Sequence, residues 1–108
     1  MLDGNKAYDQ RQFKLMLQKI EDYRNDKIYL GDLISDLEAL LDCLNLVEKK
    51  WIDNFYDYWM ELEIVYAIAL SENRNTLTEN EFNRIKEAIK SLKSMIPLYL
   101  KNHAVDSE

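Results

Sequence analysis

The sequence predicts an all-α protein that folds as an antiparallel up-down four-helix bundle. First, only two glycines and one proline occur in 108 residues, far fewer than a sheet with many tight turns requires. Second, apolar residues recur every three or four positions along most of the chain, the period of a core-facing helix. Third, short polar stretches separate these periodic segments, so consecutive helices should lie antiparallel. At this length, one domain over residues 1–108 is expected.

The first two helices are expected over about residues 5–24 and 30–45, joined by the polar residues 25–27. The first has a sparse apolar stripe made of Phe13, Met16, Leu17, Ile20 and Tyr23. The second has the clearest stripe, with Leu30, Leu33, Leu37, Leu40, Leu41 and Leu44 in line and Ile34 at the edge. The steps of three and four residues place each stripe on one helix face.

The third and fourth helices are expected over about residues 48–72 and 78–96. Their stripes are Ile52, Phe55, Trp59, Leu62, Tyr66 and Ala69 in the third, and Phe82, Ile85, Ile89, Leu92 and Ile96 in the fourth. Thr78 and Glu81 have the spacing of a capping box, with Leu77 and Phe82 as its hydrophobic staple. Pro97 should end or kink the fourth helix, and residues 101–108 should form a flexible tail.

Acidic residues are concentrated in one third of the chain. Residues 28–63 contain nine acidic side chains against two lysines. The other residues are nearly balanced, so this segment accounts for the net charge of −6. A local field of one sign speeds encounters with an oppositely charged partner. We therefore expect a basic partner and no nucleic acid.

The candidate partner-binding residues lie on the second and third helices. They are Asp32, Asp36, Asp53, Tyr56, Asp57, Tyr58 and Glu61. On a helical wheel, Asp53, Asp57 and Glu61 form one column opposite the core stripe. Like charges one turn apart cost an isolated helix a few tenths of a kcal/mol each, so stability alone does not favour them. The two tyrosines are the candidate anchors, because aromatic side chains bury much area at interfaces.

Three further patterns have both structural and functional interpretations. Ser35, Ala39 and Cys43 recur every fourth residue and would form a shallow groove, either for a partner or for the first helix, in which case Cys43 is a buried apolar residue. Glu63 falls beside the core stripe, where it should pair with a tyrosine hydroxyl or an arginine, Arg84, or else have a functional role. A third pattern is the basic line of Lys86, Lys90 and Lys93, which suits the negative end of the helix dipole.

No catalytic constellation is evident in the sequence, so we expect a protein that is not an enzyme and has no cofactor. One histidine and one cysteine are too few for a zinc site, and His103, in the expected tail, is not close in sequence to Cys43, so no paired nucleophile and base is evident. A magnesium-dependent all-α nucleotide pyrophosphatase is a less favoured alternative, since the i, i+4 carboxylate pairs point outward instead of into a cleft. The lone cysteine and the lack of an apolar leader or a membrane-length apolar stretch favour the cytoplasm.

Residues 29–41, followed by Trp51, Phe55, Trp59 and residues 62–67, resemble small all-helical immunity proteins of bacterial contact-dependent inhibition and other polymorphic toxin systems. The resemblance covers roughly residues 28–72, about 40% of the chain. It implies an antitoxin that binds a cognate basic toxin domain, commonly a nuclease. The acidic residues would then steer the toxin, Tyr56 and Tyr58 would anchor it, and Gly31 would permit a close approach or simply begin its helix.

A helical adaptor or a homo-oligomeric interaction module is the alternative. Apolar residues at the edges of the stripes would support self-association: Leu15, Leu46 and Ile64. Apolar self-association should depend weakly on salt, whereas capture of a basic toxin should slow as salt screens the charges.

Overall fold

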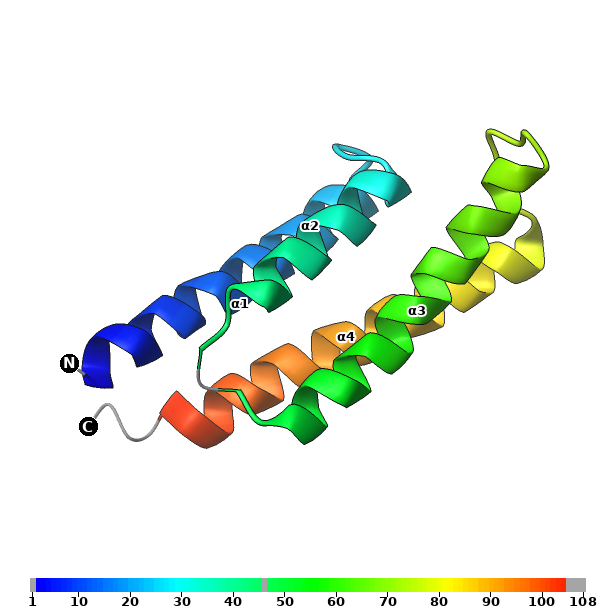
Figure 1. Cartoon of the computed structure of the whole chain (residues 1–108). Helices are drawn as coiled ribbons and strands as arrows, with labels where there is room; N and C mark the ends of the chain where they lie inside the picture. Colours follow the sequence, from blue (N-terminus) through cyan, green and yellow to red (C-terminus); the bar gives the residue numbers. More distant parts are fainter. Residues whose placement is uncertain (1, 46, 105–108) are drawn as a thin grey trace.

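Four α-helices account for most of the chain in the computed structural model, which describes the backbone of residues 2–45 and 47–104 and the side chains of residues 7–45 and 47–96. They are α1 (Leu2–Arg24), α2 (Leu30–Asp42), α3 (Lys49–Ser71) and α4 (Glu79–Ala104). Within these ranges there is no strand. Each helix contacts the next, α4 contacts α1, and the chain direction alternates (Figure 1). The predicted all-α four-helix bundle is confirmed.

Buried apolar side chains from all four helices form one continuous core. They are Phe13, Met16 and Ile20 of α1, Leu33, Ile34, Leu37 and Leu41 of α2, Phe55, Trp59, Leu62 and Val65 of α3, and Ile85, Ala88, Ile89, Leu92 and Ile96 of α4. Inside this core the Trp59 indole Nε1–H donates to the Ile34 carbonyl at 2.9 Å, which links α3 to α2. The stripes expected from periodicity therefore supply most of the core, and Val65 and Ala88 are additions to them.

Phe82 is the one expected stripe residue that is exposed, with an exposed fraction of 58%, whereas the others are buried or partly buried. The Lys93 ammonium of α4 contacts Glu21 near the end of α1 at 2.9 Å. From Lys93 back to its first residue, α4 is about 20 Å long, at a rise of about 1.5 Å per residue. In the same direction, α1 continues only about 5 Å past Glu21. The start of α4 thus projects beyond α1, and no part of α1 covers Phe82.

Two expected helix ends differ from the structure. α2 ends at Asp42 and not near residue 45, because the backbone N–H of Asn45 donates to both carboxylate oxygens of the buried Asp9 in α1, at 2.9 and 3.2 Å. α4 continues through Pro97 to Ala104, so the end expected at residue 96 is wrong. A proline removes one backbone donor, and the helix can continue on both sides of it. Of the expected tail, residues 101–104 are helical and residues 105–108 lie outside the described part.

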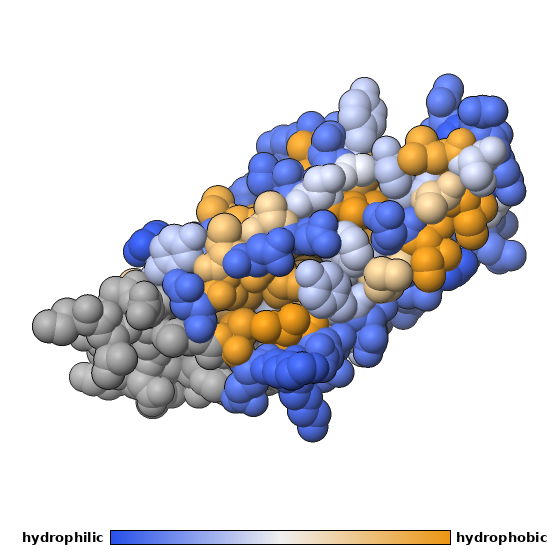
Figure 2. Space-filling model, viewed as in Figure 1, coloured by the Kyte–Doolittle hydropathy of each residue, from blue (hydrophilic) through white to orange (hydrophobic). Residues whose placement is uncertain are grey.

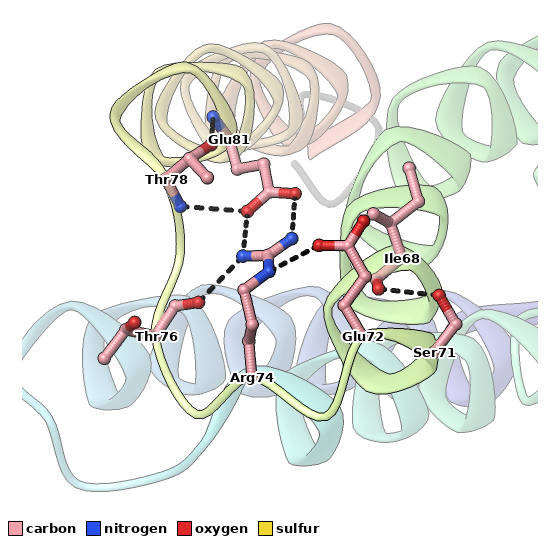
Figure 3. Close-up of polar contacts among 7 residues, drawn as sticks. All are labelled: Ile68, Ser71, Glu72, Arg74, Thr76, Thr78 and Glu81. Carbon is pink, nitrogen blue, oxygen red and sulfur yellow. Dashed lines mark hydrogen bonds and ion pairs between the residues drawn. The ribbon is translucent and has the colours of Figure 1, made fainter.

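The α3–α4 connection is held by charged hydrogen bonds (Figure 3). The expected capping box is present: the Glu81 N–H donates to the Thr78 hydroxyl at 3.1 Å, and the Thr78 N–H donates to the Glu81 carboxylate at 2.9 Å. Arg74 adds a two-pronged ion pair to Glu81 at 2.7 and 2.8 Å, and its Nε donates to Glu72 at 2.7 Å. The end of α3 and the start of α4 are therefore joined through one guanidinium.

Candidate partner-binding surface

One solvent-facing side of α3 changes from acidic to apolar along the helix. Asp53 and Asp57 occupy its N-terminal half, and Met60, Ile64 and Ile68 continue the same side at steps of three and four residues. The three apolar side chains are 43%, 39% and 37% exposed. We call these five residues the α3 outer face.

Apolar surface gathers over the C-terminal half of α3, at the upper right of Figure 2, with hydrophilic groups around it. Leu70, 57% exposed, lies on the same half of the helix. Single exposed apolar side chains are ordinary, but a contiguous group rimmed by polar residues is typical of an interaction site. The α3 outer face therefore combines an apolar area with adjacent carboxylates.

The two carboxylates of this face are accessible to a partner. Asp53 pairs with Lys49 one turn earlier at 2.9 Å, and both side chains are mostly exposed. Such surface pairs contribute only a few tenths of a kcal/mol, so Asp53 can exchange Lys49 for a partner's cation at little cost. Asp57 is exposed and has no hydrogen bond or ion pair with another described residue.

Glu61 leaves the acidic column that the wheel predicts. Its carboxylate accepts a hydrogen bond from the Arg84 Nε of α4 at 3.0 Å, and the Nη2 atom of the same guanidinium lies 3.0 Å away as an ion pair. Tyr58, 38% exposed, lines the same shallow hollow of about 390 Å³ between α3 and α4. These two candidate residues therefore face α4, and one of them already has an intramolecular partner.

Tyr56 lies on the opposite margin of α3, towards α2. It is half-buried and packs edge-to-face against Trp59, with ring centroids 5.6 Å apart. Burial raises the pKa of its hydroxyl, and the nearby carboxylates of Asp42 and Glu38 raise it further. The pair on α2 that approaches α3 is thus Glu38 and Asp42, which were not among the candidate site residues.

The two candidates on α2 have local roles. Asp36 lies 3.4 Å from the Lys19 ammonium of α1. The Asp32 carboxylate accepts the backbone N–H of Tyr29 at 3.2 Å, at the start of the helix. The seven candidates are therefore spread over several sides of α2 and α3, and only Asp53 and Asp57 belong to the α3 outer face.

The remaining expectations have mixed outcomes. Ser35, Ala39 and Cys43 are exposed, so this row is not buried under α1 and Cys43 is not a buried apolar residue, although its thiol contacts Tyr8 of α1. Partly buried Glu63 has no hydrogen bond or ion pair with the described residues, because Arg84 reaches Glu61 instead. Leu15 is 46% exposed, as expected of an edge residue, and Leu46 lies outside the described residues.

Sequence reasoning singled out Ile64 as an edge residue but missed Met60 and Ile68. The signal was present, because these three residues continue the side of Asp53 and Asp57 at steps of three and four residues. It was missed because the acidic positions were considered by charge alone.

The close approach expected at Gly31 is present: a Cβ atom built there would lie 2.6 Å from the Tyr66 hydroxyl of α3.

Comparisons with protein-family models, curated proteins and solved structures found no match. Among the side chains that the structure describes, no group of three or more histidine, cysteine, aspartate or glutamate residues could hold a metal ion. None of the described helices has the length and apolar character to span a membrane.

Proposed function

We propose that this protein is a non-enzymatic immunity protein of a bacterial toxin system, which binds and neutralises a cognate basic toxin domain. The observation that carries the proposal is the α3 outer face, where exposed carboxylates adjoin an exposed apolar row. The concentration of negative charge in residues 28–63 and the resemblance to immunity proteins support it. The site of action would be the cytoplasm, where a toxin of the nuclease kind would meet its substrate.

The two halves of the α3 outer face would act at different stages of binding. Asp53 and Asp57 would raise the association rate with a cationic toxin surface, since steering acts before contact. Met60, Ile64 and Ile68 would be buried in the complex and would slow dissociation, since affinity differences reside mainly in the dissociation rate. A basic active site covered by carboxylates could no longer bind nucleic-acid phosphates.

The test is co-purification with the product of the neighbouring gene, followed by binding kinetics at several salt concentrations. A stoichiometric basic partner whose association slows with salt supports the proposal, as does restored growth of cells that express both proteins. Recovery of the protein alone at every salt concentration, or no protection of growth, would overturn it.

Matched variants separate the two roles. Asp53→Lys with Asp57→Lys should slow association by about tenfold or more, whereas Asp22→Lys with Glu87→Lys, with the same change in net charge, should have a much smaller effect. Met60→Ser with Ile64→Ser should raise the dissociation rate by about tenfold or more, and Leu15→Ser on α1 should not. Equal effects of both charge pairs would mean that only net charge matters.

Self-association through the apolar row is the second candidate, because exposed apolar area of this kind also suits a helical adaptor or homo-oligomer. Two copies of an acidic face repel each other, so such a dimer would be strengthened by salt, which screens the repulsion. Sedimentation of the pure protein at low and high salt distinguishes this alternative from toxin capture, for which salt weakens binding.

A further inference from the structure

A second hollow, distinct from the α3 outer face, lies between the end of α1 and the projecting half of α4. Its volume is about 580 Å³, within the range of pockets that hold small molecules. Tyr23 of α1 forms one wall, and Ile85, Ile89 and the exposed Phe82 of α4 form another. The interior is therefore apolar and partly aromatic, and it exists because α4 extends beyond α1.

Two lysines on the rim of this hollow have no structural explanation. Lys86 and Lys90 line it one helical turn apart, and neither has an ion pair with any residue that the structure describes. The dipole of α4 does not account for them, because the helix continues to Ala104 and the dipole effect is confined to the last turn. Like charges at this spacing are unfavourable in an isolated helix.

The other charges of the hollow are arranged around its α1 end. Lys93 and Arg24 both pair with Glu21, at 2.9 and 3.1 Å, and the Lys93 ammonium lowers the pKa of that carboxyl. Asp26, on the α1–α2 connection, contributes a negative charge to the lining. An anionic group would therefore avoid the α1 side and approach Lys86 and Lys90.

We propose that this hollow binds a small anionic amphiphile, such as a medium-chain carboxylate. Its head group lies between Lys86 and Lys90, and its apolar body lies over Phe82, Ile85 and Ile89 against Tyr23. Charge complementarity selects the head group, and burial of the otherwise exposed Phe82 ring favours the apolar body. This inference involves α1 and α4 only and does not depend on the proposed toxin binding.

The test is isothermal titration calorimetry of the full chain with decanoate at neutral pH. Decan-1-ol, which has the apolar chain without the negative charge, and inorganic phosphate, which has the charge without the chain, serve as comparison probes. Lys86→Glu with Lys90→Glu should weaken decanoate binding by about tenfold or more, since both ion pairs with the head group are lost and replaced by repulsion. The control is Lys14→Glu with Lys50→Glu, which makes the same change in net charge on α1 and α3. Circular dichroism checks that both variants retain their helices.

Saturable decanoate binding that is lost in the first variant and kept in the second, with amide chemical-shift changes at residues 82–94, supports the proposal. Equal binding of decan-1-ol, equal losses in both variants, or binding only to anionic lipid vesicles would overturn it. An absence of decanoate binding to the wild-type protein would also overturn it.

Discussion

Several short charged hydrogen bonds meet at the α3–α4 loop, around Arg74 and Glu81. Glu81 is buried, and its carboxylate satisfies the Thr78 backbone N–H and two guanidinium nitrogens at once. The guanidinium lowers the pKa of Glu81 to about 2, with a further contribution from the Thr78 hydrogen bond. In turn, the Glu81 carboxylate and, to a smaller extent, the Glu72 carboxylate raise the pKa of the Arg74 guanidinium.

Because its folded-state pKa is depressed, Glu81 should stabilise the fold at neutral pH and lose this contribution in acid. The advantage of the wild type over Glu81→Gln should be complete above pH 4.5, the ordinary value, and should disappear as the pH falls to about 2. Arg74→Gln should lose most of the same pH-dependent stability. Urea unfolding at a series of pH values measures this, and a difference that persists unchanged at pH 2 would contradict it.

Gly31 is needed for the contact between the start of α2 and Tyr66. A Cβ atom there would lie 2.6 Å from the tyrosine hydroxyl and 2.8 Å from the ring carbon that carries it, so the stiff ring must move. Gly31→Ala should cost about 1–3 kcal/mol as overpacking, although alanine normally favours a helix. In a double-mutant cycle, Tyr66→Leu should be less costly in the Gly31→Ala protein. Additive unfolding free energies would show that the ring is not the obstacle.

Among the elements, α2 is the shortest helix, and a side chain of α1 determines where it ends. Continuing the helix would direct the Asn45 N–H to the Leu41 carbonyl, but Asp9 accepts it instead. The Leu44 N–H also shortens its step and donates to Leu41 at 3.2 Å. The turn towards α3 is thus a tertiary interaction between segments 36 residues apart in sequence.

Asp9→Ala should leave the Asn45 N–H without its partner and destabilise the protein by about 1–3 kcal/mol. Asp9→Asn, which retains an acceptor oxygen, should cost less. Hydrogen exchange of the Asn45 amide, measured with urea unfolding, tests the assignment directly. A protected Asn45 amide in Asp9→Ala would mean that another group holds this turn.

At the scale of the whole molecule, one core is shared by helices of unequal reach. Leu37 is fully buried where the helices meet, whereas Leu70 and Phe82 lie on the projecting part of the α3–α4 hairpin and are more than half exposed. That projection leaves the hollow beside Lys86 and Lys90 open. The different extents of α1 and α4 thus account for this hollow.

Leu37→Ala should cost about 2–5 kcal/mol, because it removes a fully buried side chain and leaves a cavity. Leu70→Ala, the same substitution on the projecting end, should change the unfolding free energy by less than about 0.5 kcal/mol. Urea unfolding of both variants measures the contrast. Similar losses would show that the projecting end is covered in solution, as it would be in a dimer.

The sequence alone is sufficient to predict the four helices, most of the core and the capping box at the start of α4. These features depend on local periodicity or on a three-residue spacing, which the order of residues contains directly. It also located Asp53 and Asp57 on a solvent-facing side of α3. The sequence also predicts that the protein binds a toxin, and this remains a prediction.

How far each helix extends past its neighbours, and which charges pair across helices, depend on how the helices pack together. Asp9 ends α2 at a distance in sequence, Arg84 draws Glu61 away from the acidic column, and the reach of α4 beyond α1 exposes Phe82. Each outcome depends on the relative placement of two helices, and a helical wheel describes only one.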